Sequence, residues 1–350
     1  MTGMAFLRRA AHTSARSRPA DPRPAIARFW SWWSEHRDQV LAAANDDRRD
    51  ELAELLAPAV AAIDPALEWE LTAGPPARLT LSAGGDIERR AVTERWFSSA
   101  PDDPDVEFAP ARQAVADGGS PGTVQVDDFD IDLSELVAGT GVDPRRGALD
   151  VVVHHPLFPL LDEDARGKVA ALGLAAVLGE DDVQRWVGTV TVSADQPVDA
   201  IAMSMLPVVV DQLRPADPWV SLQGAGRKGP VVAVARRPLL RIDRPLADTH
   251  LGIVLGYRGA ANGLPRDEAV TTDARELQER VIEALGGDGP HAVHVGEVTG
   301  GRHIVAHFYV DGLEVDVTAA DPIVRTWSHG PAVARHTYDP DWEQVAALRG

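Results

Sequence analysis

Residues 291–310, HAVHVGEVTGGRHIVAHFYV, hold the pattern from which the fold of the last third of this chain follows. Apolar and polar residues alternate on both sides of Gly300 and Gly301, a pattern typical of two half-buried strands. The glycine pair predicts a two-residue turn, because such turns need positive φ angles that glycine adopts easily. We therefore expect an antiparallel hairpin formed by residues 291–299 and 302–310.

This turn predicts which hairpin residues face each other. The predicted pairs are Val298 with His303, Gly296 with Val305 and His294 with His307. Side chains alternate between the two faces of a strand. One face should therefore carry His294, His303, His307 and Tyr309 together with Val305. The other face should carry Val293, Val295, Ile304, Ala306 and Phe308, and should pack against helices.

The segments around the hairpin predict its fold. The periodicity of apolar residues indicates strands at 251–257 and 333–338 and helices at 267–285 and 319–327. The resulting order is strand, helix, strand, strand, helix, strand. This is the split βαβ pattern of a ferredoxin-like domain, an antiparallel sheet with both helices on one face. The histidines would then lie on the face that the helices leave uncovered.

Composition predicts how the chain is divided into domains. We expect a fold of the α+β class with two domains. Residues 1–23 are rich in arginine and read as a disordered basic tail. Residues 24–222 read as an N-terminal mixed α+β domain, with a further break near 117–123 that would divide it in two. Residues 223–245 are rich in Pro, Gly and Arg and are expected to be a linker. Residues 246–350 form the ferredoxin-like domain.

Charge and cysteine content exclude several classes of function. The 350 residues include no cysteine, which excludes disulfides, thiolate metal sites and cysteine nucleophiles and favours a cytoplasmic location. No apolar run of membrane-spanning length is present, so no membrane association is expected. The formal net charge is −19, which repels nucleic acid and favours a basic protein surface as partner.

Three motifs match known patterns but not the structural context that those patterns need. Residues 224–229 fit G-x-G-x-x-G, but a β-patterned segment follows where a helix is required. Residues 118–122 fit the G-x-S-x-G pattern of serine hydrolases, again without a following helix. The aspartates at 128, 130 and 132 lack the glycine and glutamate of a calcium loop. We therefore expect no cofactor and assign no catalytic residue.

The histidine face is the candidate site, with His294, His303, His307 and Tyr309 as binding residues. Neutral imidazoles on one face of a sheet can bind a metal, transfer protons or contact a partner. A metal-assisted hydrolase using His294, His303 and His307 is therefore an alternative. In the simplest interpretation the histidines are only polar strand residues.

The last third of the chain resembles a bacterial family described as domain of unknown function 695. The resemblance lies in His250-Leu251-Gly252-Ile253-Val254, Asn262-Gly263-Leu264-Pro265, Gly296-Glu297-Val298-Thr299-Gly300-Gly301, His307-Phe308-Tyr309 and Tyr338-Asp339-Pro340-Asp341-Trp342. That family is distantly similar to the regulator of ribonuclease activity B, a small acidic inhibitor. The resemblance implies a ferredoxin-like domain with a binding role and no catalytic residues.

Together these observations predict a non-enzymatic protein-binding or regulatory module. The alternatives are the metal-assisted hydrolase and an immunity-like inhibitor.

Overall fold

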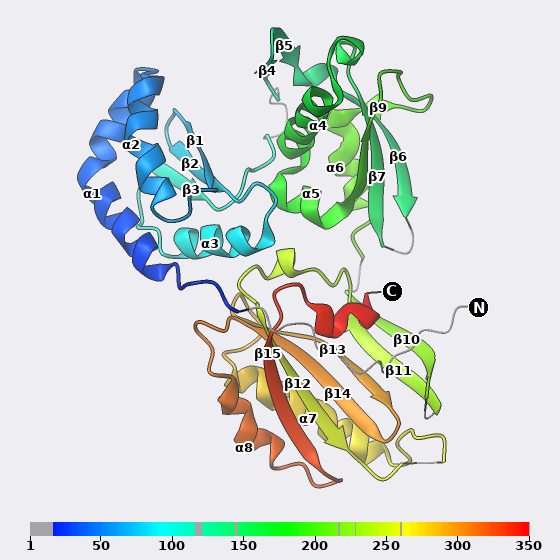
Figure 1. Ribbon diagram of the computed structural model, residues 1–350. Helices are drawn as coiled ribbons and strands as arrows, with labels where there is room; N and C mark the ends of the chain where they lie inside the picture. Colours follow the sequence, from blue (N-terminus) through cyan, green and yellow to red (C-terminus); the bar gives the residue numbers. More distant parts are fainter. Residues whose placement is uncertain are drawn as a thin grey trace. The chain divides into compact units, whose positions relative to one another are not determined.

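The computed structural model describes residues 17–115, 121–143, 146–215, 218–227, 229–259 and 261–349. The chain combines helices and strands and belongs to the α+β class. It divides into two compact units, one of residues 22–214 and one that joins the residues up to Asp21 to residues 215–350 (Figure 1). Within the described ranges, no helix has both the length and the apolar character that crossing a membrane requires.

The first hydrophobic core of the unit 22–214 is aromatic. Its elements are α1 (Arg23–Asn45), α2 (Arg49–Ala61), α3 (Ile87–Ser98) and a sheet of order β1 (Glu68–Thr72), β2 (Ala77–Ser82) and β3 (Val106–Ala109). Trp30 stacks on the fully buried Trp96 with ring centroids 5.0 Å apart. The Asp86 carboxylate begins α3 by accepting hydrogen bonds from the backbone N–H groups of Glu88 and Arg89.

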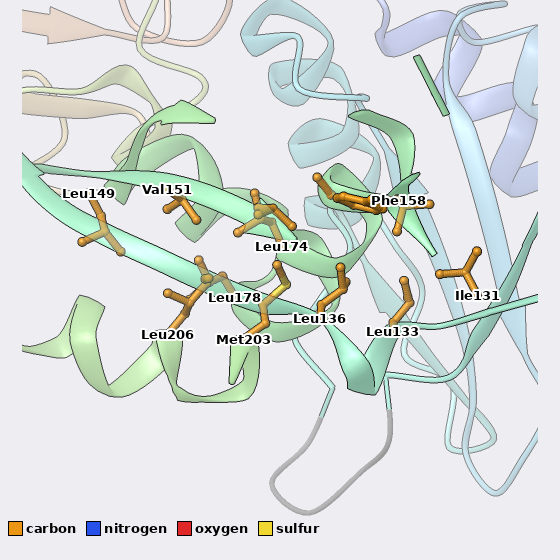
Figure 2. Packing of buried hydrophobic residues seen from close by; sticks show 14 of the residues in the cluster. Ile131, Leu133, Leu136, Leu149, Val151, Phe158, Leu174, Leu178, Met203 and Leu206 are labelled. Carbon is orange, nitrogen blue, oxygen red and sulfur yellow. The ribbon is translucent and has the colours of Figure 1, made fainter. Parts of the chain in front are cut away.

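The second core of this unit is mainly aliphatic, with Phe158 and Trp186 as buried aromatic residues, and lies later in the sequence (Figure 2). Its strands are β4 (Thr123–Val126), β5 (Phe129–Asp132), β6 (Val137–Asp143), β7 (Ala148–His154), β8 (Val187–Val192) and β9 (Ile201–Ala202), and its helices are α4 (Glu163–Leu178), α5 (Glu180–Trp186) and α6 (Leu206–Asp211). Short 3-10 turns lie at Leu133–Glu135, Phe158–Leu160 and Met203–Met205. Leu174 of α4 packs with Leu149 and Val151 of β7 in this core.

A buried carboxylate joins the two parts of this unit. Glu180, the first residue of α5, accepts hydrogen bonds from the backbone N–H groups of Gly85 and Arg112 at 3.0 and 3.2 Å. The hydroxyl of Ser82 donates a third at 3.2 Å. Since buried polar groups are costly without partners, these bonds favour one arrangement of α5 against the first sheet.

The unit that contains residues 215–350 is built on one six-stranded sheet. Its strands are β10 (Trp219–Gly226), β11 (Gly229–Arg236), β12 (Thr249–Gly256), β13 (Ala292–Gly300), β14 (His303–Val310) and β15 (Ala332–Tyr338). They lie in the order β10-β11-β13-β14-β12-β15, and every neighbouring pair is antiparallel. The helices are α7 (Glu268–Ala284) and α8 (Asp321–Val324), with 3-10 segments at Arg241–Asp243, Val317–Ala320 and Glu343–Leu348.

The two faces of this sheet are covered differently. Helices α7 and α8 pack on one face, where Leu277 and Val281 contact a core that includes Ile253 and Phe308 (Figure 1). On the other face, the C-terminal segment packs Trp342, Val345 and Leu348 against Ala233, Ala235 and Val295. The C-terminal segment therefore covers part of the face that the sequence predicts to be open.

Two sequence-based expectations about the chain's organisation differ from the structure. Residues 223–245 are not simply a linker, because the glycines and Pro230 shape the β10–β11 hairpin, which adds two strands to the sheet. Of the tail predicted at 1–23, residues 1–16 lie outside the described part. Arg18 is fixed, since it donates hydrogen bonds to the Gly312 carbonyl at 2.6 Å and to Asp248 at 2.8 Å. The predicted break at 117–123 falls between the two cores of the first unit, and residues 116–120 are not described.

Candidate functional site

The turn of the β13–β14 hairpin lies one residue later than the glycine pair predicts. Gly300 pairs with His303, so the two turn residues are Gly301 and Arg302. Both have positive φ angles, 58° and 70°, which is the geometry of a type I′ turn. The predicted pairs are therefore wrong: Val298 faces Val305 and Gly296 faces His307. A shift of this size moves residues along the sheet without changing their faces. Val293 and Val295 are nevertheless not on the helix-covered face where we expect them, because an irregularity in β13 puts them in the core beneath the C-terminal segment.

A β-bulge places His294 on the face opposite to the one predicted. The register shifts between His294 and Gly296, so that His294 pairs with Phe308 and not with His307. Its ring stacks on Phe308 with centroids 4.7 Å apart, on the side of the helices. An extra residue in one strand reverses the alternation beyond it. The sequence pattern of alternating residues gives no sign of the bulge.

The bulge also explains why residue 296 is a glycine. A Cβ atom there would lie 2.6 Å from the Val234 carbonyl oxygen and 3.0 Å from Ala235 Cα. The neighbouring strand β11 can approach β13 this closely only because no side chain stands between them. Gly296 thus permits the β10–β11 hairpin to join the sheet.

The remaining predicted residues share one face with a histidine that the sequence analysis did not select. His303, His307 and Tyr309 alternate along β14, and strand pairing places His250 of β12 directly opposite Tyr309. We call this side of the sheet, opposite to α7 and α8, the histidine face. His303 lies at its exposed end, where its Nδ1 is 3.0 Å from the carbonyl oxygen of Gly301.

A hydrogen-bonded imidazole pair occupies the middle of the histidine face. His250 Nε2 lies 2.9 Å from His307 Nδ1, so one nitrogen donates and the other accepts. Burial lowers the pKa of His250 from its ordinary 6.5 to about 4. Burial, and then the neighbouring His250 and His294, lower the pKa of His307 to about 3. Both rings are therefore neutral near pH 7, and the pair contributes no charge to the face.

Tyr309 connects the sheet to the C-terminal segment. Its hydroxyl donates a 2.5 Å hydrogen bond to Asp339 Oδ2, and its ring stacks on Trp342 with centroids 4.2 Å apart. Burial and the Asp339 carboxylate hold the pKa of Tyr309 far above its usual range. Asp339 also accepts the backbone N–H groups of Glu343 and Gln344, each at 2.9 Å. Tyr309, which we expected to bind a partner, is thus used to hold the chain's own end.

An apolar row crosses all six strands next to the imidazole pair. Direct cross-strand pairing connects Leu222, Ala233, Val298, Val305, Val254 and Val333 in this order. The first three pack into the core beneath the C-terminal segment. Among the described residues, no hydrophobic cluster includes Val254, Val305 or Val333, and Val333 is 41% exposed. We call these three residues the open row.

The open row is bordered by one arginine and by histidines. Arg335 lies next to Val333 along β15, on the same face, and pairs with Gly252, whose other neighbour is His307. The Arg335 side chain has no carboxylate partner within the described ranges. The strand residues of the histidine face include no Asp or Glu: they are Val220, Leu222, Gly224, Gly226, Val231, Ala233, Ala235, His250, Gly252, Val254, Gly256, Val293, Gly296, Val298, Gly300, His303, Val305, His307, Tyr309, Val333, Arg335 and Thr337.

Comparison with protein-family models, with curated proteins and with solved structures found no match to this chain.

The described residues do not bring together a metal site. No group of three or more histidine, aspartate or glutamate side chains with suitable geometry occurs in the described ranges. The three histidines proposed as ligands are separated, because His294 lies on the helix side and His303 at the far end of β14. The arrangement therefore offers no geometric support for a metal-assisted hydrolase at these residues.

A hollow in the unit 22–214 has a volume of about 400 Å³ and two arginines in its wall. Both arginines are already paired, Arg78 with Glu107 at 2.9 Å and Arg112 with Glu68 at 2.7 Å. The hollow therefore presents no free charge from these side chains, and the histidine face remains the better candidate.

His250 and Arg335 also belong to the site, although neither is among the residues predicted from the sequence. Arg335 lies within the strand predicted at 333–338, whereas His250 lies one residue before the strand predicted at 251–257. What the pattern could not give was the pairing of β12 with both β14 and β15, which brings these residues beside His307.

Proposed function

We propose that this chain is a protein-binding module that contacts its partner through the histidine face. The observation that carries the proposal is the open row, in which the side chains of Val254, Val305 and Val333 stand next to each other without a covering element among the described residues. Contiguous apolar surface bordered by polar residues is typical of protein interaction sites. To bind a protein, a surface of this kind needs only groups that contact and orient the partner, and no group that takes part in a reaction.

The strand order supports a finer description of the fold, which we also propose. Reading β15-β12-β14-β13 along the sheet gives the fourth, first, third and second strands of a split βαβ unit, with α7 and α8 on one face. This arrangement fits a ferredoxin-like domain extended by the β10–β11 hairpin. It also fits the resemblance to the domain of unknown function 695 family, and we propose membership in that family on this basis.

Affinity capture with matched variants tests the binding function. Val333→Asp places a charge in the open row. Val190→Asp places one on β8, an edge strand of the other unit, and the two valines are 41% and 42% exposed. We expect wild type and Val190→Asp to retain the same protein from a lysate of the source organism. Val333→Asp should lose it, and the purified partner should rebind wild type.

The proposal is wrong if Val333→Asp retains every partner that wild type retains. Circular dichroism of each variant provides the folding control, since an edge-strand position tolerates a charge better than a core position.

A further inference from the structure

The molecule already binds one segment on the apolar row. The C-terminal 3-10 segment Glu343–Leu348 and the preceding Trp342 place apolar side chains three residues apart, at Trp342, Val345 and Leu348, over the covered half of the row. The chain around them is acidic, with Asp341 and Glu343 on either side of Trp342. A short helical segment with regularly spaced apolar residues is thus one ligand that this face accepts, and this segment carries carboxylates beside its first apolar residue.

The charges next to the open half of the row favour a ligand that is acidic, as the C-terminal segment is. Although the chain has a net charge of −19, the strand residues of this face include no carboxylate, while Arg335 stands beside Val333. Asp339, a carboxylate for which the structure shows a role on this face, is buried and bound by Tyr309. Carboxylates of a partner would therefore meet Arg335 without repulsion from neighbouring strand residues.

We propose that the histidine face binds an aliphatic helical protein segment flanked by carboxylates, with its apolar side chains on the open row and a carboxylate at Arg335. This inference rests on the proposed binding function and adds the chemistry of the partner. The net negative charge of the chain favours a basic partner, whereas this inference gives the histidine face an acidic partner.

Two synthetic peptides test the charge of the partner. Both carry the same aliphatic residues at the spacing of Trp342, Val345 and Leu348, and one has glutamate flanks where the other has lysine flanks. Binding to the full chain is measured by fluorescence anisotropy at low and high salt. We expect the glutamate peptide to bind about fivefold more tightly at low salt, and the difference to shrink at high salt, because rim ion pairs are screened.

Three variants separate the charge from the apolar contact. Arg335→Glu should reverse the preference between the two peptides. Val333→Asp should weaken both peptides, while the matched Val190→Asp should weaken neither. Equal affinities for the two peptides, both lost in Val333→Asp, would overturn the proposed partner chemistry and leave the binding face standing. No binding of either peptide, or binding that Val333→Asp leaves unchanged, would overturn both.

Discussion

His250 Nε2 and His307 Nδ1 lie 2.9 Å apart and form a hydrogen bond between neighbouring strands of the sheet. The strand that carries His250 has Gly252 as its next residue on this face, and His307 lies opposite that glycine. The two rings therefore meet diagonally, above a position with no side chain. This contact adds a side-chain hydrogen bond to the β12–β14 pairing, and the low pKa of the two buried rings should make the stability of the sheet depend on pH.

Acidification should destabilise the folded chain through His250. Its pKa is about 4 in the folded chain against an ordinary 6.5, so the unfolded chain binds the proton first as the pH falls. The stability contributed by the neutral ring is complete above about pH 6.5 and is lost as the pH falls towards about 4. In His250→Gln, the fall in unfolding free energy between about pH 7 and about pH 5 should be smaller by about 2 kcal/mol.

Urea unfolding of both proteins at the two pH values measures this difference. Carboxylates titrate in wild type and variant alike, so their contribution cancels. The same pH dependence in both proteins would contradict a depressed His250 pKa.

Gly252→Ala should disturb the imidazole pair directly. The new Cβ atom would lie 2.8 Å from His250 Cε1, which forces the ring away from His307. We expect a loss of about 1–2 kcal/mol in the unfolding free energy, from the strained contact and the lost hydrogen bond. Gly141→Ala in β6 is the matched strand control, because a Cβ atom added there would have no neighbouring atom within 4 Å. Equal stabilities of the two variants would argue against the contact.

Tyr309→Phe should loosen the C-terminal segment. The substitution removes one donor from the buried Asp339 carboxylate and leaves the N–H groups of Glu343 and Gln344. We expect the unfolding free energy to fall by about 1–2 kcal/mol and amide exchange to increase within Glu343–Leu348. A double-mutant cycle with Asp339→Ala isolates the bond, and additive effects of the two substitutions would show that the residues are not coupled.

Glu180→Ala should destabilise the unit of residues 22–214. It leaves the N–H groups of Gly85 and Arg112 without their acceptor and removes the partner of the Ser82 hydroxyl. A loss of about 2–4 kcal/mol follows from the desolvation of these groups. The exposed Glu163 at the start of α4 gives the control, and its alanine variant should change stability by no more than about 0.5 kcal/mol. Similar losses in both variants would mean that Glu180 has no special role.

Part of the site followed from local pattern alone. The alternation of His303, Val305, His307 and Tyr309 placed these four residues on one face, because a strand has a period of two wherever it pairs. His294 was placed on the wrong face because the bulge next to Gly296 depends on contact with β11, a strand far away in the sequence. Local alternation cannot report such a contact.

Local sequence was sufficient to predict the helices and strands of the C-terminal third, the presence but not the register of the β13–β14 hairpin, and the chain's acidity, since these depend on near neighbours and composition. Three features required the folded chain: residues 219–236 join the sheet, the C-terminal segment covers half of the apolar row, and His250 and Arg335 stand beside His307. They arise from contacts between strands and segments distant in sequence. Their free energy depends on packing across the whole sheet, and no local pattern encodes it.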